Sequence, residues 1–354
     1  MKRLIVLLPL FTYLACMAQS YEYLGTVDGL SDRRVYAITE DPKEHLWFLN
    51  NNGVDRYDGE KFKHYKTIAN NKTINYSSTQ SRLYTDPKGS VWVVSETGQL
   101  FRYNYLLDSY QLMAELPQQG LPNFSLSCSY LDRQGNIWMC ASGEQYIYQT
   151  PTKKLIRVQS NRSGRIISMV QTADNNYYVS TSSGIYRAIL QNNILRIIAR
   201  PSSYLSFDTI ELIYYHPATN KLILCSRSKG IYVYDIQHRQ ISKPCTELKG
   251  VRIIRIRDFE NYHLLIATDG AGIYNMDINT CTLNSYIVAD YTQPNKMNGN
   301  HINDVLIDKN KRIWVANYPI GITMVNYEQT EYSWIKHSLG NKQSLVDNQI
   351  NCVI

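Results

Sequence analysis

The sequence predicts an all-β fold, a seven-bladed β-propeller of four-stranded antiparallel blades, on two observations. A pattern of Asp, Trp, Gly and Tyr recurs seven times in the 354 residues. The apolar runs between its turn residues are only four to six residues long. A repeat of about 40 to 50 residues made of short strands is typical of a propeller blade. Helical repeats need longer segments with a 3.6-residue period, which these runs do not provide.

The clearest copy of the repeat extends from Asp41 to Asp58. We expect a strand before Asp41 and a second strand around Trp47, because Asp and the Pro after it favour a tight turn. A third strand follows Gly53, which supplies a positive-φ backbone at the turn. The run 62–66 is expected to form the fourth strand. Each blade is thus predicted to be a meander of four strands.

One large apolar residue marks the second strand of every repeat. At spacings of 40 to 48 residues, these residues are Trp47, Trp92, Trp138, Tyr178, Leu224, Ile266 and Trp314. A large aromatic ring buries about 150–250 Å² when it fills the wedge between two twisted sheets. We therefore interpret the repeated Trp as a core residue between blades and not as a ligand contact.

The two ends of the sequence are expected to differ from the propeller, which should span 19–343. Residues 1–18 have a basic start, an apolar middle and a small last residue, which is typical of a secretory signal peptide. Cys16 leaves a lipoprotein signal open as the alternative. Residues 344–354 align with the opening of the first repeat and are interpreted as the start of a truncated eighth repeat. On this interpretation the chain is a fragment, the first propeller of a longer protein.

Two segments could supply the outermost strand of the last blade, 21–24 or 332–336. We favour 21–24, because its pairing with 322–326 would join the two ends of the propeller and fasten the ring. The other segment would then begin the next propeller of the longer protein.

Charge and cysteine content limit the kinds of partner and the cellular location that we expect. The formal net charge is +7, but Lys and Arg are scattered, and Arg252, Arg255 and Arg257 are expected to alternate faces on a strand. Nucleic acid is therefore not an expected partner. Cys128 and Cys140 should face each other across a hairpin, either as a disulfide of an exported protein or as two small buried side chains.

Motifs for catalysis or cofactors do not occur in the sequence. The seven histidines are isolated, and neither a metal-ligand spacing nor a glycine-rich phosphate loop is present. We expect no catalytic residue, no metal and no cofactor. A propeller could still bring acids from separate blades together, so an enzyme acting on polysaccharide, a lyase or a hydrolase, stays open as an alternative.

Three stretches of the first repeat resemble the two-component regulator propeller repeat. They are DGLSDRRVYAITED from Asp28 to Asp41, Leu46-Trp47, and NGVDRYD from Asn52 to Asp58. That repeat is typical of the periplasmic sensor region of Bacteroides-type hybrid two-component histidine kinases. The resemblance implies a ligand-sensing module that responds to oligosaccharides and controls genes for polysaccharide use. It also implies a periplasmic location, a parent anchored in the inner membrane with its kinase outside this segment, a second propeller as partner, and a possible homodimer.

The binding site is expected on the face that carries the longer loops. Both the turns between second and third strands and the connections between repeats should emerge there. Amide and charged groups can pair with sugar hydroxyls, and tyrosine rings can lie against apolar sugar faces. The candidate ligand contacts are Arg33, Asn50, Asn51, Glu96, Arg227, Asp269, His301 and Tyr318. A protein-interaction scaffold is a further alternative for this face.

Overall fold

The computed structural model describes residues 20–326, apart from 118–124, 162–163, 200–208 and 291–296. The predicted signal peptide and the predicted eighth repeat both lie outside the described residues. Within the described residues the regular structure is β-sheet, apart from one turn of 3-10 helix at Thr26–Asp28. The all-β prediction is confirmed.

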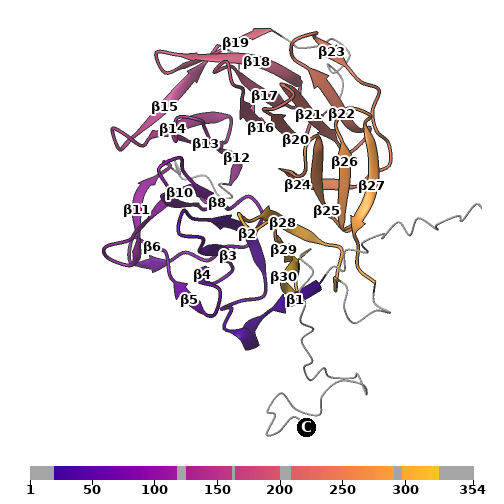
Figure 1. Ribbon diagram of the computed structural model, residues 1–354. Coiled ribbons are helices and arrows are strands. Elements are labelled where there is room, and N and C mark those ends of the chain that lie inside the picture. The colour runs from indigo at the N-terminus through magenta and orange to yellow at the C-terminus, as the bar shows by residue number, and fades with distance from the viewer. Residues whose placement is uncertain (1–19, 118–124, 162–163, 200–208, 291–296, 327–354) are drawn as a thin grey trace, which may run out of the picture.

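Antiparallel units of four strands follow one another along the chain and lie around a common centre (Figure 1). Unit 1 consists of β2 (Val35–Glu40), β3 (Leu46–Asn50), β4 (Gly53–Tyr57) and β5 (Phe62–Tyr65). Unit 2 consists of β8 (Arg82–Thr85), β9 (Val91–Val94), β10 (Gln99–Asn104) and β11 (Ser109–Glu115). Unit 3 consists of β12 (Leu126–Leu131), β13 (Ile137–Ala141), β14 (Glu144–Gln149) and β15 (Lys154–Ser160). Unit 4 consists of β16 (Ile166–Gln171), β17 (Tyr177–Thr181), β18 (Gly184–Gln191) and β19 (Ile194–Ala199).

The chain continues with three more units of the same kind. Unit 5 consists of β20 (Leu212–His216), β21 (Lys221–Ser226), β22 (Gly230–Asp235) and β23 (Gln240–Ile241). Unit 6 consists of β24 (Arg252–Asp258), β25 (His263–Asp269), β26 (Ile273–Asp277) and β27 (Thr282–Ile287). Unit 7 consists of β28 (Ile302–Ile307), β29 (Ile313–Asn317), β30 (Gly321–Asn326) and β1 (Ser20–Leu24). The predicted four-stranded antiparallel arrangement is thus confirmed.

Two details depart from a simple series of meanders. A short hairpin, β6 (Ile68–Ala69) with β7 (Lys72–Thr73), lies between units 1 and 2. Units 3 and 4 are joined into one eight-stranded sheet, because β15 and β19 pair in parallel where Gln159 meets Ile194.

The N-terminal strand completes the last unit, as predicted. β1 pairs antiparallel with β30, with Tyr21 opposite Val325 and Leu24 opposite Ile322. The alternative segment 332–336 lies outside the described residues. Closure of unit 7 thus uses backbone hydrogen bonds between the two ends of the described chain.

Buried apolar clusters fill the spaces between consecutive units. Trp47 of unit 1 packs with Val91 and Val93 of unit 2. A corresponding cluster joins unit 7 to unit 1, where Trp314 packs with Phe48. Neighbouring units are therefore held together by side-chain packing, and the backbone hydrogen bonds run mainly within each unit.

The four tryptophans occupy equivalent buried places between units, as predicted. Their exposed fractions are 0% for Trp47, 2% for Trp92, 0% for Trp138 and 2% for Trp314. Each indole N–H donates to the carboxylate of the aspartate six residues earlier. The pairs are Trp47 with Asp41 at 3.0 Å, Trp92 with Asp86 at 2.9 Å, Trp138 with Asp132 at 3.4 Å, and Trp314 with Asp308 at 2.8 Å.

The same aspartate also holds the turn between the first two strands. In unit 1, Asp41 Oδ1 accepts hydrogen bonds from the backbone N–H groups of Lys43 and His45, at 2.9 and 3.1 Å. Asp86, Asp132 and Asp308 accept from their own turns in the same way. The expected role of Asp in the turn is confirmed, and its bond to the indole is an addition from the structure.

The predicted alignment of the fifth and sixth repeats, at Leu224 and Ile266, is wrong by one residue. Leu224 packs toward unit 4, with Tyr178, whereas Trp47 packs toward the following unit. The residue of unit 5 that faces its following unit is Ile223. In unit 6 the corresponding residue is Leu265, and Ile266 faces back toward unit 5. Successive side chains of a strand point to opposite faces, so an error of one residue reverses the face.

The turn glycines adopt the expected backbone, and the structure adds a second reason for them. Gly53 has φ +143 and Gly230 has φ +102. A Cβ atom on Gly53 would lie 2.3 Å from the carbonyl oxygen of Tyr65, and one on Gly230 would lie 2.0 Å from that of Cys245. A side chain at these turns would therefore collide with the neighbouring backbone.

The predicted register of the third hairpin is confirmed. Leu131 lies opposite Ile137, and Cys128 lies opposite Cys140. Both cysteines are free thiols in the structure. Of the two states that the sequence left open, the structure therefore contains the reduced pair.

Replacing any one of the four tryptophans by Ala is expected to lower the free energy of unfolding by about 3–5 kcal/mol, which is the usual cost of replacing a large buried aromatic residue by Ala. Urea unfolding followed by fluorescence would measure the change. Leu106→Ala is the control, because Leu106 is 96% exposed and its loss should change stability by no more than about 0.5 kcal/mol. An equally small effect at Trp47 would contradict the core assignment.

Stability should decrease in acid because of Asp41. Burial opposes its ionisation, but hydrogen bonds from Trp47 and His45 outweigh burial and hold its pKa below the ordinary 3.8. A lowered pKa stabilises the fold at pH values above the unfolded-state pKa and loses this effect as the pH falls through the folded-state value. The difference in unfolding free energy between wild type and Asp41→Asn should therefore shrink below about pH 4. A difference that stays constant down to about pH 3 would contradict this linkage.

Candidate functional site

One face of the molecule is formed by two kinds of loop that are bonded to each other. The turns between second and third strands contact the connections that lead into the next unit. Backbone N–H groups of one loop donate to carbonyl groups of the other. Examples are Tyr76 to Asn51 at 3.2 Å, Leu126 to Glu96 at 2.8 Å, Gly250 to Arg227 at 2.7 Å, and Gly270 to Asn300 at 3.0 Å. The prediction that both loop types share one face is confirmed, and we call this surface the loop face.

Three of the predicted ligand contacts lie together where units 6 and 7 meet. His301 Nδ1 lies 2.8 Å from Asp269 Oδ1. The two side chains are 63% and 46% exposed, so both can reach solvent and a ligand. Tyr318 is 41% exposed, and its backbone N–H is bonded to His301. This group offers an imidazole, a carboxylate and an aromatic ring on one patch.

The patch extends toward unit 1 through residues that the sequence interpretation missed. Arg34 donates from Nε and Nη2 to Asp32, at 3.0 and 2.8 Å. It also lies near the phenol groups of Tyr36 and Tyr318. The hydrogen bond from Arg34 holds the pKa of Asp32 below its usual value. The only signal in the sequence was an Asp and an Arg two residues apart, directly beside the predicted Arg33.

Asn50 lies beneath the loop face and not on it. It is 0% exposed, and its Nδ2 donates to Ser31 at 2.9 Å and to Asp55 at 2.6 Å. Its Oδ1 accepts from the backbone N–H of Asn52 at 3.0 Å. The amide of Asn50 is therefore used inside the protein, so we correct the expectation and leave Asn50 out of the site.

Glu96 also has a mainly internal role. Its carboxylate accepts hydrogen bonds from the hydroxyl groups of Ser77, Ser78 and Ser81, at 2.5, 2.6 and 3.4 Å. These serines belong to the connection between units 1 and 2. Glu96 thus fastens this connection to the turn of unit 2.

The remaining predicted residues lie at separate places on the loop face. Arg33 is exposed, and no described residue accepts a hydrogen bond from its guanidinium group. Asn51 is partly exposed beside Tyr76, in the turn of unit 1. Arg227 is exposed in the turn of unit 5, and its Nε donates to the carbonyl of Gly250 at 3.2 Å. Arg33 precedes Arg34 in the chain, whereas Asn51 and Arg227 lie in the turns of two different units.

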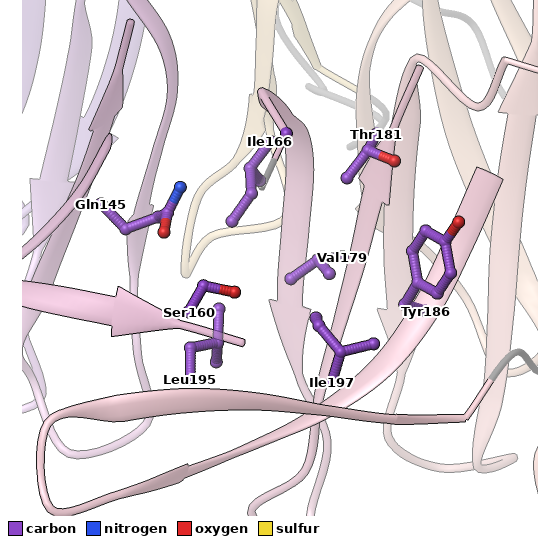
Figure 2. Close-up of a pocket in the computed structure, with 9 residues that line it drawn as sticks. Gln145, Ser160, Ile166, Val179, Thr181, Tyr186, Leu195 and Ile197 are labelled. Atoms are coloured by element: carbon purple, nitrogen blue, oxygen red, sulfur yellow. The ribbon is translucent and has the colours of Figure 1, made fainter. Parts of the chain in front are cut away.

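Two cavities in the described part of the chain lie away from this patch. One lies between units 3 and 4, where Ser160, Ile166, Tyr186 and Leu195 surround it (Figure 2). Its volume of about 20 Å³ has room for about one water molecule. The other, of about 240 Å³, lies by the turns of units 1 and 7 that hold the repeat aspartates, and its lining includes Lys43, Tyr57 and Arg312.

Metal binding by side chains finds no support in the described part of the chain. No group of three or more His, Cys, Asp or Glu residues there is arranged to hold an ion. The described residues also contain no helix with the length and apolar character needed to cross a membrane.

Comparison with solved structures places the fold among known propellers. No protein-family model matches the sequence, and no curated protein sequence matches it. The extracellular domain of BT3049 from Bacteroides thetaiotaomicron, assigned to a hybrid two-component system, superposes with a TM-score of 0.68 at 19% identity, over 88% of this chain and 42% of that chain. The corresponding domain of BT4673 from the same organism gives 0.66 at 22% identity, over 87% of this chain and 40% of that chain. The resemblance indicated by the repeat motifs thus extends to the three-dimensional fold.

A second class of proteins has the same fold. Virginiamycin B lyase from Staphylococcus aureus superposes with a TM-score of 0.66 at 14% identity, over 87% of this chain and 99% of that chain. At identities this low, a superposition demonstrates a shared fold but not a shared activity. The present chain spans less than half the length of the two extracellular domains from Bacteroides thetaiotaomicron.

Single substitutions in the patch are expected to leave the fold intact. Asp269→Asn and His301→Gln remove an exposed pair, and exposed ion pairs contribute about 1 kcal/mol or less. A double-mutant cycle measured by urea unfolding should give a coupling energy within that limit. A loss above about 2 kcal/mol in either variant would show that the pair is a structural element of the connection between units 6 and 7.

Proposed function

We propose that this chain is the periplasmic sensing module of a hybrid two-component regulator, folded as a seven-bladed propeller. The observation that carries the proposal is its similarity to extracellular domains of two-component systems over 88% of the chain. In this proposal the seven four-stranded units are the blades, and the pairing of β1 with β30 closes the ring. Residues 1–18 would direct export, and residues after 343 would lead into a second propeller of a membrane-anchored parent.

The ligand in this proposal is an oligosaccharide bound on the loop face between units 6 and 1. Asp269, His301 and Arg34 can pair with hydroxyl groups, and the exposed ring of Tyr318 can lie against a sugar face. The loops there are fixed by backbone hydrogen bonds, so little ordering would accompany binding. Signalling would follow if the bound ligand also touched the neighbouring propeller of the parent, which in turn could form a homodimer.

Calorimetric titration of the purified chain against a panel of plant and host oligosaccharides tests the proposal. We expect one class to bind, and Tyr318→Ala to weaken that binding about fivefold or more, because buried aromatic contacts often contribute over 1 kcal/mol. Asp269→Asn and Arg34→Gln should weaken it as well. Leu106→Ala, at an exposed turn between third and fourth strands, is the matched control.

Two outcomes would contradict the sensor assignment. If no member of the panel binds, the loop face is not a saccharide site, and an interaction scaffold becomes the better interpretation. If the titrated oligosaccharide is cleaved on prolonged incubation, as chromatography would show, the enzyme alternative is correct.

A further inference from the structure

Three arginines on the innermost strands converge near the centre of the ring. Arg82 begins β8, and Arg255 and Arg257 lie on β24, two residues apart and on the same face. The sequence interpretation expected the arginines of this segment to alternate faces, which is wrong for these two. All three arginines interact with one carboxylate, that of Asp304 on β28.

Both carboxylate oxygens of Asp304 accept hydrogen bonds from groups other than Arg82. Arg255 Nε lies 2.9 Å and Arg257 Nη2 lies 3.2 Å from its Oδ1. The backbone N–H groups of Val305 and Ile38 donate to its two oxygens, at 2.8 and 3.0 Å. The carboxylate is only 1% exposed. It therefore ties units 6, 7 and 1 together and leaves no free oxygen for Arg82.

The guanidinium group of Arg82 is attracted by Asp304 but forms no direct ion pair or hydrogen bond with a carboxylate of the described residues. Its one hydrogen bond there runs from Nη1 to the carbonyl of Ser81, at 3.3 Å, out of five possible N–H donors. Burial, together with the positive charge of Arg255, lowers the pKa of Arg82 to about 10. The charged form of Arg82 is thus disfavoured at its own site, and an anion beside it would relieve this cost.

The propeller repeat does not require an arginine at this position. Tyr84 of β8 lies opposite Trp92 of β9, and Arg82 precedes Tyr84 by two residues. The residues at the same place in the other units are Ala37, Cys128, Ser168, Leu212, Arg255 and Asp304. Neutral side chains occupy this position in four of these units, so folding alone does not explain a cation in unit 2.

Arg82 lies directly beneath the loop face. Its neighbour Ser81 accepts a hydrogen bond from the backbone N–H of Glu96, at 2.9 Å, in the turn of unit 2. Arg82 and Arg255 are both partly exposed, so solvent reaches this group. A ligand on the loop face could extend a substituent toward the centre and meet these guanidinium groups.

We propose that Arg82, with Arg255 beside it, binds an acid group of a sugar ligand, a carboxylate or a sulfate. That the ligand is a sugar rests on the proposed function. That it carries an acid group rests on the guanidinium group of Arg82, which forms no ion pair in the described structure. Guanidinium groups bind carboxylate and sulfate oxygens through paired, charge-assisted hydrogen bonds. The ligand class is therefore an acidic saccharide, with a uronate or a sulfated sugar as the two possible sources of the anion.

Binding of small acids to the purified chain tests this site. The probes are sodium glucuronate and sodium sulfate, with glucose as the neutral counterpart and sodium chloride at matched ionic strength. Uronate-containing and sulfated disaccharides then distinguish the two sources. Arg82→Gln should weaken binding of the acids about tenfold, the loss expected for one charge-assisted contact. This variant leaves Asp304 with both of its arginine partners.

Arg196→Gln is the matched control, because Arg196 is exposed on β19, the outer strand of unit 4, and carries the same charge. It should bind the acids as the wild type does. If Arg82→Gln does not fold, as circular dichroism would show, Arg82→Lys replaces it. The lysine variant keeps the charge but not the forked geometry, and should bind the acids measurably more weakly than the wild type.

The outcomes separate this inference from the proposed function. Acid binding that depends on Arg82 and not on Arg196 supports the inference. Equal binding by wild type and Arg82→Gln, or acid binding no stronger than that of chloride, overturns it. If only neutral oligosaccharides bind, the acid site fails and the sensor proposal stands. If the simple acids bind through Arg82 but no saccharide in the panel binds, the sensor proposal fails.

Discussion

The fold depends on one repeated interaction, in which an aspartate holds both a turn and a tryptophan. In unit 1, one oxygen of Asp41 accepts from the turn backbone, and the other accepts from the indole of Trp47. The first bond fixes where the second strand begins. The second bond fixes the orientation of the ring that fills the space before the next unit. A local turn is thereby coupled to packing between units, and the coupling recurs wherever the Asp and the Trp are both present.

Where this pair is missing, apolar side chains fill the same place between units. Unit 5 has Ile223 at the place of the tryptophan and unit 6 has Leu265, and both side chains are fully buried. The seam between units 6, 7 and 1 has its own reinforcement, the buried carboxylate of Asp304 with two arginines and the backbone of β2. A buried carboxylate needs this number of partners, because each unmatched charge in the interior is costly.

The loop face and the centre of the ring have different physical characters. On the face, Asp269 and His301 are exposed and satisfied by each other, so they are free to exchange partners with a ligand at little cost. At the centre, Arg82 lies near Arg255 and forms no direct ion pair with a carboxylate of the described residues. A ligand that combined hydroxyl groups with an acid group would match both regions at once.

The sequence by itself determined the repeat, its four strands, the buried tryptophans, the pairing of Cys128 with Cys140 and the closing strand. These follow from local signals, namely the period, the turn residues and the alternation of apolar side chains. The sequence could not align Leu224 and Ile266, because without a tryptophan nothing marks which of two adjacent apolar residues faces the next unit. Nor could it show that Asn50 is buried, that Arg34 belongs to the candidate site, or that Arg82 and Arg255 meet near the centre. Residues from different units become neighbours only when the ring forms, so tertiary structure alone decided those contacts.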